Sequence, residues 1–198
     1  LAKTNTQFDD EDFFEIKRLM KDRKDNIWVG AKTGLSKITF KNNSETFDIQ
    51  KFNDIKDKQG TLIQNSVFAI EEDRMGNIWV GYWKKGIAKI TFDTQSETYT
   101  SVNYQNEFNN INSLSNNFVR DILEDSNGDI WIGTIRGLNK LKKDAVGNIA
   151  FTSYLNDSEN KNSLSNNYVL DVFQASDGHL YVGTFGGGLN QIEISNNT

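Results

Sequence analysis

The chain contains 198 residues, of which 36% are hydrophobic and 12% aromatic, a composition that supports a packed domain and excludes an intrinsically disordered one. Its net charge of −5 argues against nonspecific nucleic-acid binding, because binding to phosphates needs an excess of Lys and Arg. The chain has no cysteine, which excludes disulfides, thiolate metal sites and cysteine nucleophiles. It also shows no signal peptide and no apolar run long enough to cross a membrane.

One short phrase recurs four times along the chain, at residues 26–30, 77–81, 129–133 and 179–183. Its third residue is Trp28, Trp79, Trp131 or Tyr181, and it advances by 51, 52 and 50 residues from one copy to the next. A period near fifty residues with strand-like patterning is typical of β-propeller blades, whereas helical solenoids have shorter repeats.

Each repeat contains four short runs rich in β-branched and aromatic residues, which predict a four-stranded blade. Repeat three shows them best, at residues 118–124, 129–134, 137–142 and 149–155. Its first turn ends in Gly128, in the left-handed position that commonly closes a short hairpin. Asp25 fills that position in repeat one, where an aspartate tolerates positive φ at some cost.

The predicted fold is therefore all-β, an array of four four-stranded antiparallel blades forming one segment of a larger propeller. The repeats span about residues 9–58, 59–110, 111–160 and 161–198, within a single domain of residues 1–198. Repeat four stops before a fourth strand, and residues 1–8 resemble the end of such a strand, which either closes the array or ends a preceding blade. An open array would expose strand edges and favour self-association.

The repeated aromatic residue is best explained as structural core. A large ring on the second strand fills the wedge between blades, and the glycine two residues later avoids a clash there. The Tyr181 hydroxyl then needs a polar partner. His179, the only histidine, occupies the position filled by Asn26, Asn77 and Asp129, which indicates a structural role rather than a catalytic one.

Repeats three and four share a second phrase, Asn-Ser-Leu-Ser-Asn-Asn, at residues 112–117 and 162–167. Ser and Asn bond local backbone in turns, so this phrase is expected to build the connection from one blade to the next. Together with the Asp-x-x-Gly-Asn/Asp-Ile-Trp-Val/Ile-Gly-Thr and Gly-Leu-Asn-x-Leu patterns, it resembles the two-component regulator propeller repeat over nearly the whole chain.

This resemblance implies the periplasmic sensor region of an inner-membrane hybrid histidine kinase that switches on polysaccharide-utilisation genes when an oligosaccharide binds. It also implies other blades in the same full-length chain, and a homodimeric receptor. The kinase activity would lie elsewhere, so this segment is expected not to be an enzyme. Because the chain begins at Leu1, we expect it to be part of a longer protein.

The sequence predicts no catalytic residue, cofactor or metal site. It contains no Gly-x-Ser-x-Gly elbow and no phosphate-binding Gly-x-x-x-x-Gly-Lys loop. Residues 125–129 resemble the start of a calcium loop, but Ile130 stands where glycine is needed and the distant acidic ligand is missing.

The expected ligand surface is the face formed by the connections between second and third strands and between successive blades. Trp83 lies outside the repeating position, so we expect it to be solvent-accessible and to stack on a neutral or acidic sugar, with lysines binding any anionic group. The candidate ligand-binding residues are Trp83, Lys84, Lys85, Arg120, Arg136, Phe185, Asn117 and Asn167.

Two alternatives stay open. The segment could be purely structural, associating with other blades or chains. The Gly-Asn-Ile-Trp phrase is also similar to that of streptogramin lyases, which are propeller enzymes, but that activity needs a histidine and acids around a metal in the channel, and His179 is poorly placed for it.

Overall fold

The computed structural model describes residues 15–41, 46–52, 65–143 and 148–194, and these contain only strands, turns and irregular segments. The described part of the chain has no helix, and therefore none able to span a membrane. The prediction of an all-β fold is confirmed.

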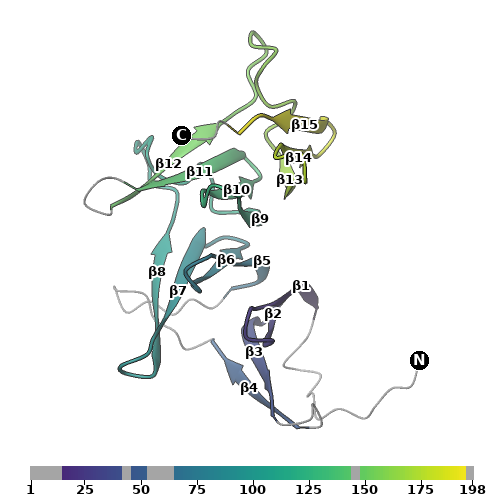
Figure 1. Cartoon of the computed structure of the whole chain (residues 1–198). Helices are drawn as coiled ribbons and strands as arrows, with labels where there is room; N and C mark the ends of the chain where they lie inside the picture. Colours follow the sequence, from purple (N-terminus) through teal and green to yellow (C-terminus); the bar gives the residue numbers. More distant parts are fainter. Residues whose placement is uncertain (1–14, 42–45, 53–64, 144–147, 195–198) are drawn as a thin grey trace.

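The strands form four antiparallel sheets in chain order, each of which is one blade (Figure 1). Blade one contains β1 (Ile16–Lys21), β2 (Ile27–Ala31), β3 (Gly34–Phe40) and β4 (Phe47–Lys51). Blade two contains β5 (Val67–Glu72), β6 (Ile78–Tyr82), β7 (Ile87–Asp93) and β8 (Thr98–Tyr104). Blade three contains β9 (Val119–Glu124), β10 (Ile130–Thr134), β11 (Gly137–Lys143) and β12 (Ile149–Tyr154). Blade four contains β13 (Val169–Gln174), β14 (Leu180–Thr184) and β15 (Gly188–Ile192), and no fourth strand among the described residues.

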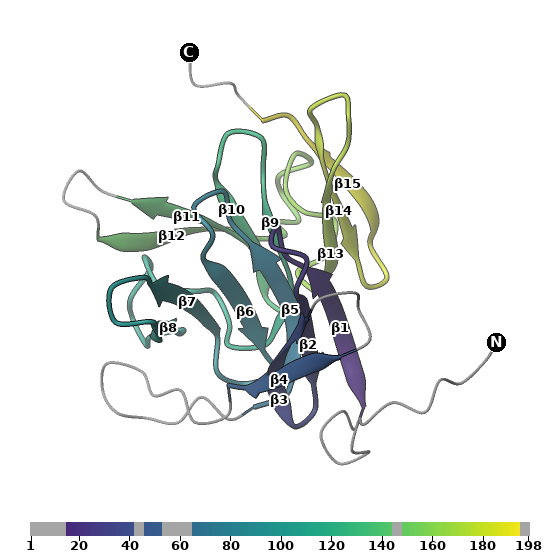
Figure 2. The same cartoon turned by 60° about the horizontal axis from the view of Figure 1, so that its bottom comes forward.

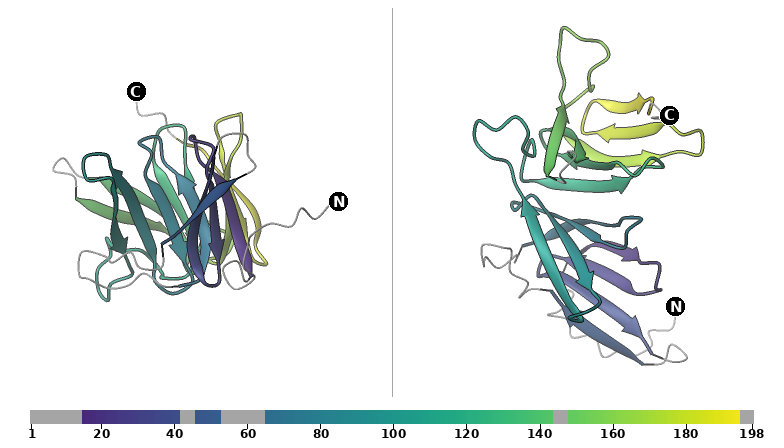
Figure 3. Two further views of the ribbon diagram at one scale, coloured as in Figure 1. Left: turned by 90° about the horizontal axis from the view of Figure 1, so that it is seen from below. Right: turned by 60° about the vertical axis from the view of Figure 1, so that its left-hand side comes forward.

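The blades stand face to face along an arc, with the first strand of each on the inner side (Figures 2 and 3). β1 packs beside β5, β5 beside β9 and β9 beside β13. Three apolar cores fill the spaces between blades one and two, two and three, and three and four. Within the described ranges no such core joins blade four to blade one, so the arc is open. Residues 1–8, the predicted closing strand, lie outside the described residues.

The sequence located the strands of blade three to within one residue at each end. The predicted turn glycine is also confirmed, since Gly128 has a φ of 86°, and Gly76 and Gly178 take the same conformation in repeats two and four at 80° and 87°. Asp25 takes the same left-handed conformation at φ 62°, and its carboxylate pairs with Lys21 at 2.8 Å.

The repeated tryptophans are buried between blades, as predicted: Trp28, Trp79 and Trp131 are each at most 3% exposed. Their indole Nε1–H groups donate to Asp22, Asp73 and Asp125 in the preceding turn, over 2.8 to 2.9 Å. Blade four has Ala175 at this aspartate position. There the Tyr181 hydroxyl donates instead to Asp177 at 3.1 Å, so it has the polar partner that we expected.

The glycine two residues after each tryptophan receives a valine of the next blade. A Cβ added to Gly30, Gly81 or Gly133 would lie only 2.5 to 2.6 Å from a Cγ1 atom of that valine. The inserted residues are Val67, Val119 and Val169. The expected clash is thus confirmed at all three interfaces.

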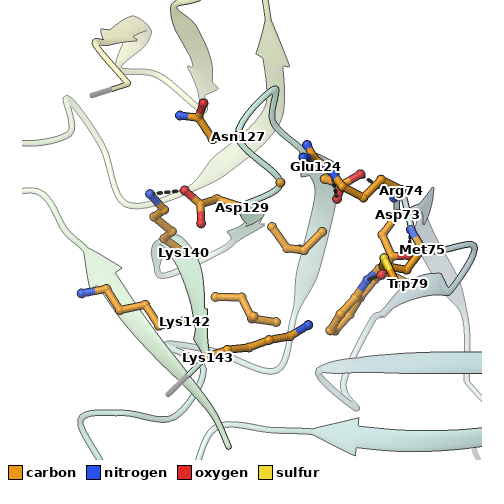
Figure 4. Close-up of a pocket in the computed structure, with 13 residues that line it drawn as sticks. Asp73, Arg74, Met75, Trp79, Glu124, Asn127, Asp129, Lys140, Lys142 and Lys143 are labelled. Carbon is orange, nitrogen blue, oxygen red and sulfur yellow. Dashed lines mark hydrogen bonds and ion pairs between the residues drawn. The ribbon is translucent and has the colours of Figure 1, made fainter. Parts of the chain in front are cut away.

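A polar clasp links each blade to the next beside these cores. The Arg23 and Arg74 backbone N–H groups donate to Glu72 and Glu124 over 2.7 Å, and each guanidinium pairs with the same carboxylate (Figure 4 shows the second pair). Between blades three and four, Ser126 and Gln174 make the equivalent contact at 2.7 Å.

The Asn-Ser-Leu-Ser-Asn-Asn phrase is a structural connection, as its composition indicates. In repeat three, Leu114 is fully buried, and the Ser113 hydroxyl accepts a bond from the Glu107 backbone N–H at 3.0 Å. Ser115 bonds to the buried Asn139 amide through both its backbone and its hydroxyl. Repeat four repeats this network around Asn190.

Candidate ligand-binding face

Three aromatic rings from blades two and three meet on the inner side of the arc. Phe68 lies on β5, Trp83 directly follows β6, and Phe118 directly precedes β9. Trp83 stacks on Phe68 with ring centroids 5.0 Å apart and meets the edge of Phe118 at 4.8 Å. All three rings are half-buried, so each keeps part of its surface open to a ligand.

Cationic side chains surround these rings. The Arg120 guanidinium carbon lies 5.1 Å from the Phe68 centroid, the Lys17 ammonium lies 5.8 Å from it, and the Lys84 ammonium lies 6.0 Å from the Phe118 centroid. Lys17 is paired with Glu15, but Arg120 and Lys84 have no ion pair with any described residue. We call Lys17, Phe68, Trp83, Lys84, Phe118 and Arg120 the aromatic–cationic cluster.

The Arg120 side chain contains a polar atom without a hydrogen-bond partner. Its Nε atom is buried and has no hydrogen-bond partner in the described structure. Burying a polar group without a partner costs free energy, and the cost is larger for a charged group. The Arg120 side chain as a whole is only half-buried and has no ion pair with a described residue, so its positive charge makes the cluster suited to bind an anionic or hydroxyl-rich molecule.

Acidic side chains lie on the inner strands β5, β9 and β13. The Arg18 guanidinium reaches across from blade one to within 3.2 Å of Asp121 Oδ1, an ion pair without hydrogen-bond alignment. The Val172 N–H donates to Asp121 Oδ2 at 2.9 Å. Burial raises the pKa of Asp121 to about 7, and the nearby Asp171 carboxyl adds to this rise. Burial also raises the pKa of Glu71.

The structure brings together three of the eight candidate residues, Trp83, Lys84 and Arg120. Trp83 is half-buried between two rings, so less of its surface is open to solvent than we expected. The sequence also missed Phe68, Phe118 and Lys17. Phe68 shares the second position of an inner strand with Lys17 and Arg120, and an alignment of the four repeats would have grouped these residues.

The other five candidates lie elsewhere on the same face. Lys85 and Arg136 line separate grooves of 470 and 310 Å³ on either side of the loop that contains Asn106 and Glu107. Phe185 is 64% exposed and tilts against Tyr168 on blade four.

The two asparagines have structural tasks. The side-chain oxygens of Asn117 and Asn167 accept bonds from the Asn106 and Asn156 backbone N–H groups over 2.7 Å, which holds each connection in shape. Any ligand role for these five residues stays a prediction.

A further groove of 530 Å³ separates blades two and three near the turns between first and second strands (Figure 4). Its carboxylates are already engaged, since Asp73 accepts from Trp79, Glu124 pairs with Arg74 and Asp129 pairs with Lys140. Burial and the neighbouring Lys143 lower the pKa of Lys89 beside this groove. The groove is therefore a weaker candidate than the cluster, because all its carboxylates are already engaged.

The described residues contain no group of three potential metal ligands. His179 lies in a turn of blade four with its Nδ1 atom 3.4 Å from Asp177. Its backbone N–H also donates to Asp177 at 3.0 Å, so its contacts fit the structural role that its position in the repeat indicates.

Comparisons with known proteins agree with this architecture. Residues 56–84, 113–136 and 163–186 match the two-component regulator propeller family. A histidine kinase P4 from Formosa agariphila is 33% identical over 125 residues, which cover 63% of this chain and 8% of that protein.

Solved structures share the fold at low sequence identity. PorZ, a surface component of the type-IX secretion system of Porphyromonas gingivalis, has a TM-score of 0.69 and 20% identity over 89% of this chain and 26% of its own. The extracellular domain assigned to a one-component system of B. thetaiotaomicron has a TM-score of 0.66 and 18% identity over 93% of this chain and 22% of its own. Virginiamycin B lyase from Staphylococcus aureus has a TM-score of 0.53 and 15% identity over 92% of this chain and 56% of its own.

The chain thus spans a small part of the histidine kinase and about a quarter of the two larger structures. Three segments of this chain thus match the two-component regulator propeller family, and its four blades with their repeated Trp–Asp or Tyr–Asp contacts have the architecture of a propeller segment.

Proposed function

We propose that this chain is an extracytoplasmic ligand-sensing segment of a hybrid two-component sensor kinase, and that it binds an acidic oligosaccharide at the aromatic–cationic cluster. The observation that carries this proposal is the contact of Trp83 with Phe68 and Phe118 beside the unpaired Arg120. The segment itself has a binding role, and the kinase activity belongs to another part of the full-length protein.

The chemistry of the cluster fits a sugar that carries carboxylate or sulfate groups. The apolar face of a pyranose ring stacks on an aromatic ring, and the planar guanidinium of Arg120 binds an oxyanion through two parallel hydrogen bonds. Lys84 adds a second positive charge close to Phe118. A neutral sugar would use the stacking surface but would leave both charges without a partner.

The comparisons support the sensor context without testing the ligand. The relative from Formosa agariphila is described as a histidine kinase, and one structural neighbour is described as an extracellular domain. A periplasmic location, homodimerisation of the receptor and control of polysaccharide-utilisation genes complete the proposal. Binding would transmit a signal only by favouring one of two arrangements of the receptor, since a ligand shifts an equilibrium only through different affinities for its two states.

Titration calorimetry with a panel of neutral, uronic-acid-containing and sulfated oligosaccharides tests the proposal. At least one acidic member should bind, and Trp83→Ala should weaken binding at least about tenfold, which corresponds to about 1.4 kcal/mol. Phe173→Ala is the matched control, because Phe173 is an exposed aromatic residue of blade four that lies outside the cluster and is not one of the candidate residues. Equal binding by both variants, or no binding by any panel member, would contradict the proposed site.

A purely structural role is the second candidate. The observation that favours it is the exposure of Phe173 and Leu189 on blade four, at 59% and 69%, because solvent-exposed apolar blade faces indicate contact with other blades or chains.

A further inference from the structure

The groove between blades two and three contains positive charges without counter-ions. Its carboxylates are engaged, whereas the Lys143 ammonium on β11 has no ion pair or hydrogen bond with any described residue. Figure 4 shows this ammonium pointing into the groove toward Trp79, while the neighbouring Lys142 points away from it. Lys89 on β7 places its own ammonium 5.8 Å from the centroid of the same Trp79 ring. Two lysines from different blades therefore converge at one tryptophan.

The lysine equivalent to Lys89 has a polar partner in both blade one and blade three. In blade one, the Lys37 ammonium donates to the Tyr99 hydroxyl at 3.0 Å. In blade three, the Lys140 ammonium pairs with Asp129. Lys89 has no such partner among the described residues. The equivalence follows from the strand register, which pairs Trp28 with Lys37, Trp79 with Lys89 and Trp131 with Lys140.

Two differences from the interface between blades one and two leave this lysine unpaired. The hydroxyl that receives Lys37 belongs to Tyr99 on β8, and Ile149 occupies the equivalent position of β12. Phe92, whose ring centroid lies 4.9 Å from that of Tyr99, is replaced at the equivalent position by Lys143. The interface between blades two and three thus has an aliphatic side chain and a positive charge in place of an aromatic pair.

The two ammonium groups disfavour each other's charged form. Partial burial lowers the pKa of Lys89, and the charge of Lys143 lowers this pKa further. The Asp73 carboxylate acts in the opposite direction, but it already accepts bonds from the Trp79 and Asn77 side chains. Like charges repel more strongly in a half-buried site than in bulk water. An oxyanion between the two lysines would replace this repulsion with charge-assisted hydrogen bonds.

We propose that Lys89 and Lys143 form a binding site for a doubly charged tetrahedral oxyanion. Two ammonium groups on separate strands match two negative charges, and the groove of 530 Å³ has room for a molecule that carries the oxyanion. Sulfate, phosphate and the phosphate monoester of a larger ligand share this chemistry. The site lies beside the beginning of β6, whereas Trp83 follows its end, so it is separate from the aromatic–cationic cluster.

Titration calorimetry at pH 8 with sodium sulfate, sodium phosphate and glucose 6-phosphate tests the site, against sodium chloride at matched ionic strength. At least one of these dianions should bind, and Lys143→Met should raise its dissociation constant at least about tenfold. Lys142→Met is the matched control, because it removes the same charge from a neighbouring side chain that points away from Trp79. No binding by any probe, or equal weakening by both variants, would overturn the proposal.

The same titrations identify the source and the charge of the ligand. Binding of the inorganic ions as well as the ester would show that the oxyanion alone is recognised. Binding of glucose 6-phosphate alone would assign the site to a phosphate ester. Glucose 6-sulfate is the charge control, because its ester group carries a single negative charge and should bind more weakly. Equal affinity for the two glucose esters would refute a site built for two charges.

The pKa of Lys89 gives a second measurement, which a general effect of surface charge would not reproduce. It is followed through the Cε signal in NMR spectra, assigned by the loss of that signal in Lys89→Met. Saturating sulfate should raise this pKa more than chloride at the same ionic strength, because a bound anion favours the charged ammonium. An equal effect of the two salts would overturn the proposal. Inorganic sulfate has no sugar ring, so failure here leaves the proposed oligosaccharide site untouched.

Discussion

Replacing Trp131 by alanine should be far more destabilising than replacing Tyr181, although both occupy the same position of the repeat. Trp131 is 3% exposed, and its ring packs into the core between blades three and four. Removing a buried aromatic side chain costs about 3–5 kcal/mol through lost burial and the cavity left behind. The loss also removes the indole donor to Asp125 and the Lys140 ammonium contact at 5.1 Å.

Tyr181 faces the open end of the arc and is only half-buried. Tyr181→Ala should therefore cost roughly 1 kcal/mol in the monomer, about half the value for complete burial of a large apolar side chain. Urea denaturation followed by circular dichroism, at a concentration where the chain is monomeric, measures both values. Comparing the two variants cancels errors that affect every aromatic deletion alike. Similar losses at the two positions, or an unchanged midpoint for Trp131→Ala, would refute the assignment of the repeated ring to the wedge between blades.

Three further outcomes are expected. The pKa of Asp121 is raised to about 7, so the native state holds a proton that the unfolded state has lost, and wild-type stability should fall as pH rises from about 4 to about 7. Asp121→Asn removes this pH dependence, so the variant should be more stable than wild type at pH 8 but not at pH 4, as measured by urea denaturation at both pH values. The charged neighbours of Asp121 are Arg18 and Asp171. An equal difference in stability at the two pH values would contradict the assignment. Binding of acidic oligosaccharides should weaken when salt rises from 0.05 to about 0.5 M, because Lys84 is exposed and salt screens its attraction to an anionic ligand. An affinity that does not change with salt would argue against a charge contact. Asn139→Ala should lower the free energy of unfolding by about 2–3 kcal/mol, because Asn139 is fully buried and bonds to Ser115, Ile132 and Ser153. Asn190→Ala should lower it by less, because Asn190 is half-buried. Thermal melts that rank the two variants the other way would oppose this.

The sequence alone determined the repeat, the strands and the buried tryptophans. These features depend on short-range patterns, because strand alternation, turn glycines and a ring followed by glycine are all set within a few residues. The roles of Gly30, Gly81 and Gly133 were predictable for the same reason. One phrase repeated at fifty-residue spacing also implies that the same contact recurs at each interface.

The composition of the candidate site was decided by tertiary structure. Phe68 and Trp83 come from blade two, whereas Phe118 and Arg120 come from blade three, and no local pattern states which rings of neighbouring blades will touch. Asn117 was predicted to bind a ligand, but its side chain binds the backbone instead. A polar residue in a loop can do either, and only the folded structure shows the contact of Asn117 with Asn106.

The raised pKa of Asp121 and the exposure of Leu189 on blade four also required the folded chain. Arg18 lies two blades before Asp121 in the sequence and reaches it only because the inner strands stand side by side along the arc. Leu189 and Leu138 occupy equivalent positions in the sequence, yet one is exposed and the other is buried. Their difference depends on whether another blade covers them, and burial is a property of the neighbours that a chain acquires when it folds.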